Sequence, residues 1–188
     1  MLLERLAIPE IMHIEPRKFS DHRGYFTESF RADWSDLGIG AGGFVQDNQS
    51  LSRQVGTVRG LHFQADPFAQ GKLVRCVAGA LFDVAVDIRH GSPSYGAWVG
   101  VELTADRGNQ LWIPPGFAHG FCTLLPDTIL CYKVSAYYSA EHDKGIAWND
   151  PAIAIAWPGL ANPASLSDKD RQLPLLADAP AYFRWGAM

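Results

Sequence analysis

Residues 72–89 read KLVRCVAGALFDVAVDIR, two valine-rich apolar runs on either side of an Ala-Gly pair. Each run has the length of a β-strand, and turn residues rather than a helical pattern lie between them. In the first run Lys72 alternates with Val74 and Cys76, so a lysine shares one face with two apolar side chains. A buried ammonium group is costly unless an anion pairs with it. The stretch therefore predicts two successive strands, the first of which directs a lysine inward if that face is the core.

Similar runs recur along the chain at about the 8 to 12 residue spacing that is typical of a β-sandwich or barrel. They are GYFTESF, GFVQDNQSLS, GTVRGLHFQ, AWVGVEL, NQLWIPP, FCTLL and ILCYKVSAYY. Helical patterns are scarce, with candidates in RADWSDLG near position 34 and in a C-terminal segment that Ser167 opens. We predict an all-β barrel or jelly roll with short peripheral helices.

Length and composition favour one folded domain. The chain has 188 residues, of which 47% are apolar and 19% are charged, enough to bury a sizeable core. The composition shifts to Pro, Ala and Asp from Gly159 onward. We therefore expect a single domain over 1–188, with a barrel core at about 20–158 and an irregular C-terminal tail at about 159–188.

The charge balance argues against nucleic acid as a partner. The net charge is −4 and the pI is about 5.8, so the chain offers no basic field. An anionic ligand must then be held by a few placed Arg and Lys side chains. We also expect no membrane partner, because MLLERLAIPE is too polar for a signal peptide and no run reaches membrane-spanning length. The three cysteines form no CxxC pair, which indicates buried thiols in a reducing cytoplasm.

TVRGLHFQ, residues 57–64, places a cation and an imidazole inside a strand. His62 shares a face with Val58 and Gln64, whereas Arg59 belongs to the other face unless Gly60 marks a bulge. Taken alone, His62 fits a hydrogen-bonded core histidine as well as a site.

LCYKVSAYY extends this pattern, because Tyr132 and Tyr138 fall on the same face of one predicted strand. Each tyrosine alone fits a core aromatic with a satisfied hydroxyl. An inward-facing histidine, lysine and tyrosine together favour a functional site over a plain core.

IPPGFAHGF, residues 113–121, has a Pro-Gly turn that enters a strand bearing His119, an arrangement typical of cupin-type barrels. In such barrels the histidine often binds a metal with an HxH pair and a Glu. Here Leu61-His62-Phe63 offers no second histidine two positions along, so the residues favour a pocket without metal.

Nine motifs in order from residue 21 to residue 170 resemble the dTDP-4-dehydrorhamnose 3,5-epimerase family of deoxysugar biosynthesis. They are DHRGYFTESF, FVQDNQS, VRGLHFQ, QGKLVR, DVAVDIR, LWIPPGFAHGF, YKVSAYYS, GIAWNDP and LSDKD. The resemblance implies a cupin-type jelly-roll barrel, a homodimer, no metal, no cofactor and a thymidine-diphosphate 4-keto-6-deoxyhexose as substrate.

The resemblance also implies a reaction: the C4 ketone acidifies the hydrogens on C3 and C5, a base forms an enolate, and a proton returns to the opposite face. His62 matches the base, and Asp170 matches the carboxylate that orients it. Tyr132 matches the general acid, and Lys72 matches the group that stabilises the enolate oxygen. Asp168 is the alternative orienting carboxylate if the register of the tail slips.

Further matching positions imply the nucleotide contacts. Arg23 and Arg59 suit the diphosphate, and Glu28, Gln46 and Asn48 suit thymine and ribose. His119 suits a phosphate or the sugar, and Tyr138 suits stacking on the nucleoside. Phe26 suits an apolar contact, and Lys169 is a further candidate for a ligand contact. Glu28, Gln46 and Asn48 equally fit solvated strand positions when taken alone. Asp143, in SAEHDKG, falls where many relatives carry Glu or another polar residue. Because the family commonly exchanges N-terminal strands across its dimer, residues 21–30 are expected near the subunit interface.

Three other functions stay open at this stage. A relative that epimerises only C3 or only C5, or that moves the keto group, shares the barrel. A non-catalytic sugar-nucleotide-binding cupin needs no inward His62, Lys72 and Tyr132 together. A metal-dependent cupin such as an oxygenase requires a metal bound through His62 and His119.

Overall fold

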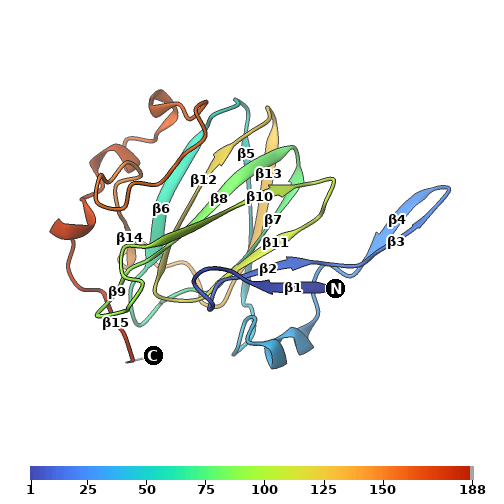
Figure 1. The fold of residues 1–188 in the computed structure, drawn as a ribbon, viewed down its shortest axis with the longest axis horizontal. Helices are drawn as coiled ribbons and strands as arrows, with labels where there is room; N and C mark the ends of the chain where they lie inside the picture. The colour runs from blue at the N-terminus through green and yellow to red at the C-terminus, as the bar shows by residue number, and fades with distance from the viewer. Residues whose placement is uncertain (187–188) are drawn as a thin grey trace.

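Two antiparallel β-sheets packed face to face form the body of the computed structural model, which describes residues 1–186 (Figure 1). The six-stranded sheet has the order β1 (Leu2–Arg5), β2 (Met12–Glu15), β11 (Gln110–Ile113), β7 (Lys72–Ala78), β13 (Thr128–Val134) and β5 (Gln46–Ser52). The five-stranded sheet has the order β10 (Trp98–Thr104), β8 (Ala80–Asp87), β12 (Phe117–Thr123), β6 (Val58–Gln64) and β14 (Asp143–Gly145). The predicted all-β, cupin-type jelly-roll class is confirmed.

The stretch KLVRCVAGALFDVAVDIR joins the two sheets. β7 lies in the six-stranded sheet and β8 in the five-stranded one, and the turn between them contains Gly79 at φ +75°. A Cβ atom at Gly79 would lie 2.4 Å from Oγ1 of Thr128, so the turn has no room for a side chain. The main core fills the space between the sheets, where Val74 and Leu130 of one sheet pack with Leu81 and Phe121 of the other.

The N-terminal strands belong to the sandwich, although the sequence placed the start of the core at about residue 20. β1 and β2 extend the six-stranded sheet, and Ile11, Met12 and Ile14 are fully or almost fully buried. These strands are short and mostly polar outside those three positions, so their pattern gave no strand signal.

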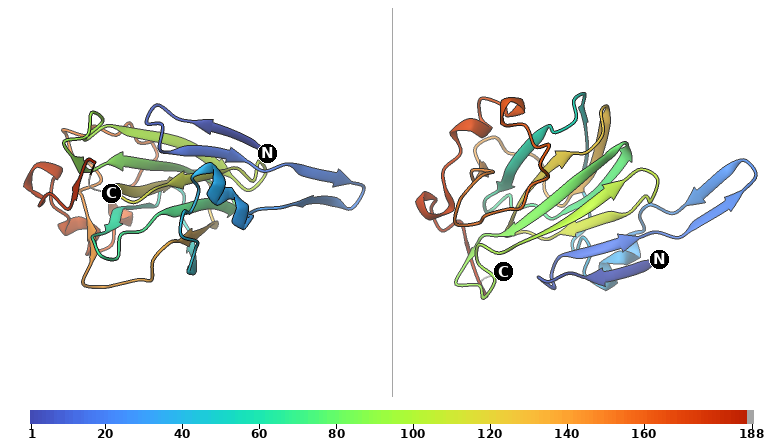
Figure 2. Two further views of the ribbon diagram at one scale, coloured as in Figure 1. Left: turned by 90° about the horizontal axis from the view of Figure 1, so that it is seen from below. Right: turned by 45° about the horizontal axis from the view of Figure 1, so that its top comes forward.

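A two-stranded hairpin of β3 (Lys18–Asp21) and β4 (Gly24–Thr27) extends away from the body (Figures 1 and 2). Phe19, Tyr25 and Phe26 are exposed on it, with Phe26 at 66%. A 3₁₀ helix η1 (Ala32–Leu37) follows, where the sequence predicted a helix near position 34. An isolated hairpin is marginally stable in water, and exposed aromatic side chains on such an element indicate a contact surface.

The C-terminal tail covers the side of the five-stranded sheet that carries β6 and β14 (Figure 1). It contains the 3₁₀ helices η2 (Pro163–Ser165), η3 (Asp170–Gln172) and η4 (Leu176–Asp178), and it ends with β15 (Phe183–Arg184), which pairs with β9 (Arg89–His90). Leu176 and Phe183 are buried with Leu61 and Phe63 of β6. The helix predicted to begin at Ser167 is only the single 3₁₀ turn η3, whose N-cap is Lys169, and the Oγ atom of Ser167 accepts a hydrogen bond from the backbone N–H of Asp170 at 3.1 Å.

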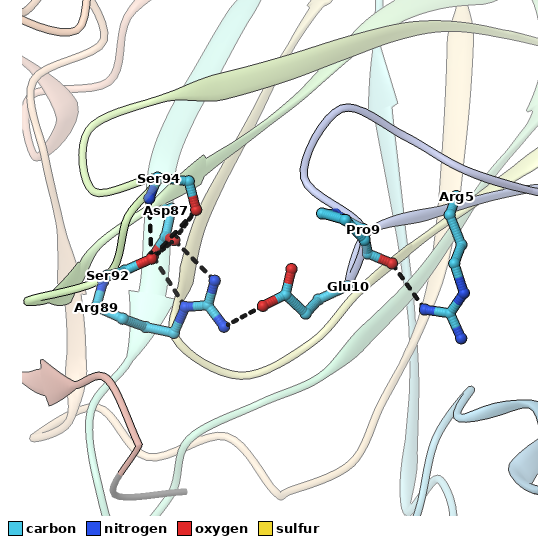
Figure 3. Close-up of polar contacts among 7 residues, drawn as sticks. All are labelled: Arg5, Pro9, Glu10, Asp87, Arg89, Ser92 and Ser94. Atoms are coloured by element: carbon cyan, nitrogen blue, oxygen red, sulfur yellow. Dashed lines mark hydrogen bonds and ion pairs between the residues drawn. The ribbon is translucent and has the colours of Figure 1, made fainter.

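A buried ion network ties the N-terminal loop to the β8–β9 turn (Figure 3). The Arg89 guanidinium donates two hydrogen bonds to the Asp87 carboxylate, at 2.9 and 2.7 Å, and one to Glu10 at 3.0 Å. The hydroxyl groups of Ser92 and Ser94 each donate to the same carboxylate at 2.6 Å. Each buried charge is therefore paired, which is the condition for tolerating it.

The sequence predicted no membrane-spanning segment and three buried thiols. In residues 1–186 no helix is both long and apolar enough to span a membrane. Cys76 and Cys122 are buried free thiols, and burial raises the pKa of each to about 11. Cys131 is only partly buried, which corrects the prediction that all three thiols are buried, because its side chain lies on the outer face of β13 beside Gln49.

Candidate active site

A cavity of about 460 Å³ opens between the two sheets. Strands of both sheets line it, and so does the segment that follows β13. Eight of the predicted site residues line this cavity: Gln46, Asn48, Arg59, His62, Lys72, His119, Tyr132 and Tyr138. Ser50, Gln64, Gln70, Phe121 and Asp143 line it as well and were not among those predicted.

A bulge in β6 positions the first of these residues. His62 pairs with His119 of β12 and Arg59 pairs with Phe121, so three steps along β6 oppose two along β12. Gly60 lies in the bulge at φ +119°, and a Cβ atom there would come within 2.6 Å of the Gly120 Cα atom. Glycine is thus required for the close approach of the two strands, and the bulge that the sequence left open at Gly60 is present. The bulge lets Arg59 line the same cavity as His62.

His62 forms a dyad with Asp170 of the tail. The Nε2 atom of His62 lies 2.6 Å from Oδ1 of Asp170, and the side chains are 32% and 4% exposed. Burial opposes ionisation of Asp170, but the hydrogen bond and charge of His62 hold the pKa of that carboxyl below its usual value. Asp168 is exposed, so the alternative register of the tail does not occur. A carboxylate at Nε2 leaves Nδ1 as the nitrogen that can take a proton.

Lys72 spans the interior from the opposite sheet. It lies on β7, is 7% exposed, and its Nζ atom donates to the backbone carbonyl of His62 at 3.2 Å. Burial lowers the pKa of Lys72 to about 8, although the charges of Asp143 and Asp83 partly oppose this effect. The inward direction of this lysine agrees with the alternation seen in the sequence, and its ammonium hydrogens are available beside the dyad.

Tyr132 of β13 lines the cavity from the same sheet as Lys72, opposite the sheet that carries His62. Its ring packs against the main core. Burial, together with the charge of Asp143, raises the pKa of the phenol. Tyr132 therefore keeps its proton at neutral pH and is a proton donor.

Polar side chains of β5 and β6 form the open side of the cavity. Gln46, Asn48 and Ser50 alternate inward along β5 while their neighbours are exposed. The Arg59 guanidinium donates to Oγ of Ser52 and to the carbonyl of Leu51, both at 3.2 Å. These bonds fix a cation at the rim, where it suits an anionic ligand.

Tyr138 lies beyond the end of β13, which corrects the prediction of one continuous strand through both tyrosines. Side-chain amides hold its loop: Oε1 of Gln64 accepts from Ser139 N at 2.7 Å, and Oε1 of Gln46 accepts from Tyr138 N at 3.1 Å. The Tyr138 hydroxyl donates to Asp143 at 3.2 Å, and Lys169 also donates to that carboxylate. Asp143 therefore links this loop to the tail at the edge of the cavity.

Comparisons with known proteins agree with this geometry. The family model for dTDP-4-dehydrorhamnose 3,5-epimerase matches residues 5–178. The chain belongs to that family. A dTDP-4-dehydrorhamnose 3,5-epimerase of Sinorhizobium fredii is 58% identical over 98% of this chain and 94% of its own length.

Two solved structures of this epimerase fold are also similar. One is dTDP-6-deoxy-D-glucose-3,5-epimerase from Legionella pneumophila in complex with dTDP-4-keto-L-rhamnose, with 45% identity, a TM-score of 0.91 and coverage of 99% of both chains. The other is ChmJ, a 3'-monoepimerase from Streptomyces bikiniensis in complex with dTDP-quinovose, with 36% identity and a TM-score of 0.84 over 92% of this chain and 86% of that one.

The projecting hairpin separates three predicted epimerase site residues from the cavity of their own chain. Arg23, Phe26 and Glu28 are exposed and do not line the cavity. Arg23 instead donates to Asp21, and Glu28 pairs with Arg31. The hairpin leads away from the sandwich (Figure 2), so a ligand contact by these three residues stays a prediction, in keeping with their expected place near a subunit interface.

His119 also belongs to a dyad in this epimerase. Its Nε2 atom lies 2.7 Å from Oδ1 of Asp83, and the two side chains are 8% and 0% exposed. Burial lowers the pKa of His119 although Asp83 opposes this. Sequence reasoning missed Asp83, but an acid on the same strand face as Leu81 and Ala85 was a usable signal. Within residues 1–186 no three His, Cys, Asp or Glu side chains are grouped as metal ligands.

Proposed function

We propose that this chain inverts C3 and C5 of dTDP-4-dehydro-6-deoxy-D-glucose and forms dTDP-4-dehydro-L-rhamnose. One observation carries the proposal. The His62 imidazole, paired with the Asp170 carboxylate, and the protonated Tyr132 phenol come from facing sheets and line one cavity. The Lys72 ammonium group lies beside His62 and donates to its backbone carbonyl. The names of the similar enzymes support the same reaction.

In the first step, Nδ1 of His62 takes the proton from C3 or C5, which the C4 ketone acidifies. Asp170 stabilises the imidazolium that forms and keeps the ring oriented. Negative charge then develops on the C4 oxygen, and the Lys72 ammonium supplies a donor for it. A single such donor typically contributes about 10²- to 10³-fold in rate.

In the second step, a proton returns to the carbon from the opposite face. Tyr132 suits this role, because its sheet faces the one that bears His62 and its phenol stays protonated at neutral pH. Inversion follows because the proton leaves toward one sheet and arrives from the other. The imidazolium of His62 then gives its proton to solvent and the phenolate of Tyr132 takes one from solvent, so that each inversion balances without an electron donor or acceptor.

The nucleotide lies, in our proposal, along the rim of the cavity. Arg59 and Lys169 are cations within reach of the diphosphate, and Tyr138 offers an exposed ring for stacking on thymine. Gln46 and Asn48 supply donors and acceptors for the base and the ribose.

The hairpin residues fit a homodimer. Arg23 and Phe26 lie on the projecting hairpin, Glu28 directly follows it, and none of the three lines the cavity of its own chain, so we infer that they reach the cavity of a second copy. The exposed aromatic residues of the hairpin would be covered by the same contact. Sedimentation of the parent and of a Phe26→Asp variant tests this, with a dimer expected for the parent and a monomer for the variant. We place the enzyme in the cytoplasm, where its free thiols stay reduced.

The test is incubation with dTDP-4-dehydro-6-deoxy-D-glucose in D₂O, with NMR detection of the label and of the product configuration. Deuterium at C3 and C5 with the L-rhamno product supports the proposal. Deuterium at C3 alone, with inversion at that carbon, identifies a 3'-monoepimerase, which is the name given to ChmJ. Absence of deuterium from both carbons identifies a protein that only binds the nucleotide sugar.

A matched pair of variants tests the base. His62→Ala is expected to abolish exchange at both carbons, whereas His90→Ala, which changes an exposed histidine on β9, is expected to keep the parent rate. Exchange at the parent rate in His62→Ala shows that another group is the base.

A further inference from the structure

Asp83 is a buried carboxylate for which the mechanism above has no task. It lies in the middle of β8 with no exposed surface, and it does not line the cavity. Its Oδ1 atom pairs with His119, and its Oδ2 atom has no hydrogen-bond partner in residues 1–186. A buried acceptor without a donor destabilises a fold by about 1–3 kcal/mol. Such a cost calls for a functional reason.

The contact with Asp83 determines which ring nitrogen of His119 is left for the ligand. A carboxylate only accepts hydrogen bonds, so Nε2 of His119 must carry the ring proton. Burial lowers the pKa of His119, and the neighbouring charges of Lys72 and His62 act in the same direction. The ring is therefore neutral, and its Nδ1 atom is an acceptor without a proton.

The two imidazoles of the site then present the same nitrogen for different purposes. His62 and His119 are direct neighbours across β6 and β12, and each has a carboxylate at Nε2. His62 is 32% exposed and is the proton acceptor of the proposed reaction, whereas His119 is 8% exposed and burial lowers its pKa. A neutral acceptor repels phosphate and keto oxygens, and it attracts a hydroxyl group, which can donate.

We propose that Asp83 is a positioning residue that holds His119 as a hydrogen-bond acceptor for a ring hydroxyl of the sugar, beside the base His62. The inference rests on the proposed function, because it takes the hydroxyl-bearing hexose as the occupant of the cavity. Of the two roles that the sequence left open for His119, phosphate contact and sugar contact, this assignment selects the sugar. It makes His119 a specificity determinant, because a sugar that lacks this hydroxyl leaves Nδ1 desolvated and unpaired.

The first test compares kcat/KM for the proposed substrate with kcat/KM for its 2-deoxy and 3-deoxy analogues. The parent is expected to disfavour one analogue by about 10- to 100-fold, the penalty of an unpaired buried acceptor. In Asp83→Asn the amide can donate to Nε2, which moves the ring proton to Nδ1, so this discrimination should fall several-fold. Asp150→Asn is the control, because Asp150 is also a buried carboxylate but lies outside the cavity. It should keep the parent ratio.

A second measurement does not require a folded Asp83 variant. ¹⁵N NMR of histidine-labelled parent protein reads the tautomer directly, and Nδ1 of His119 is expected to be unprotonated at neutral pH. His119→Asn keeps an amide near the place of Nδ1, whereas His119→Gln carries it toward the place of Nε2. The Asn variant should therefore retain more of the discrimination than the Gln variant.

The outcomes separate this inference from the proposed function. A proton on Nδ1 of His119, or a parent that accepts both deoxy analogues as well as the substrate, overturns the role of Asp83 even when the D₂O experiment shows double epimerisation. Equal loss of rate for all three sugars in Asp83→Asn assigns the residue to folding alone. An unprotonated Nδ1 with no deuterium exchange on any nucleotide sugar rejects the epimerase itself, and with it the sugar hydroxyl as the ligand.

Discussion

Replacement of Lys72 by methionine should stabilise the fold and disable the enzyme, and the stability effect should depend on pH. Lys72 is buried between the sheets, where burial lowers its pKa from 10.5 to about 8. This difference corresponds to about 3–4 kcal/mol at roughly 1.4 kcal/mol for each pKa unit. Methionine is unbranched and uncharged and fills most of the space of the lysine side chain, so Lys72→Met removes this cost.

The sign follows from proton binding. Below pH 8 the lysine is charged in both states, and the folded state bears the full cost of burying the charge. Between pH 8 and 10.5 the folded protein has released the proton while the unfolded chain still holds it, so the free energy of unfolding of the parent rises with pH. The advantage of Lys72→Met over the parent should therefore shrink by about 2–3 kcal/mol between pH 7 and pH 10.

Urea unfolding of both proteins at each pH unit from 7 to 10, followed by tryptophan fluorescence, measures this advantage. Contributions from other titrating groups cancel in the difference between the two proteins. A difference that stays constant within about 0.5 kcal/mol, well below the expected change, refutes the buried-charge account. In parallel, kcat/KM of Lys72→Met should fall by about 10²- to 10³-fold, and the activity of the parent should decline as the pH rises through about 8.

Three further predictions concern the dyad, the acid and the bulge. Asp170→Asn should lower kcat by about 10²- to 10⁴-fold with little change in KM, because the amide stabilises the wrong tautomer of the base; unchanged kcat in steady-state assays contradicts the dyad. Tyr132→Phe should lower the rate of product formation by about 10²-fold or more, while deuterium exchange into recovered substrate, measured by NMR, declines less. If product formation and exchange decline equally, Tyr132 is not the acid. Gly60→Ala should cost about 3 kcal/mol or more in urea unfolding, because its Cβ atom would lie 2.8 Å from the His119 carbonyl oxygen at φ +119°. Gly42→Ala, at φ +87° with open space around it, should cost only about 1 kcal/mol, and equal costs contradict the close-approach argument.

Alternation along strands predicted much of the fold because most strands of the sandwich bury one face. Lys72 and Tyr132 could be placed inside from their own segments, since Val74 and Val134, two positions along from each, are fully buried. Such patterns fail where a strand has little to bury. β1 and β14 have few buried positions and are stabilised by pairing with longer neighbours, which a local pattern does not register.

Contacts between distant segments were beyond reach of local reasoning for another reason. The carboxylates of the two dyads lie far from their histidines in the chain, since Asp170 comes 108 positions after His62 and Asp83 comes 36 before His119. Asp170 was assigned only because LSDKD resembles a family motif, whereas Asp83 had no such support. For the hairpin residues the motif indicated ligand contacts and the family resemblance placed them near a subunit interface, but neither gave the projecting hairpin that carries Arg23 and Phe26.

The elements that carry the site differ in how firmly they are held, and the least regular of them joins the dyad to the ligand-binding edge of the cavity. His62, Lys72, Tyr132 and His119 all lie on strands, so ladder hydrogen bonds fix their backbone positions, as catalytic geometry requires. Asp170 is the exception. Its segment is held by Ser167, by the contact of its own carboxylate with the bulge at Gly60, and by tail residues such as Leu176, whose N–H donates to Asp150 at 2.7 Å. The His62–Asp170 dyad is thus complete only when the tail packs on β6, and the same tail carries Lys169 to Asp143 at the rim. The tail therefore links two parts of the site: the contact of Asp170 with His62, and the edge of the cavity where we expect the nucleotide to bind.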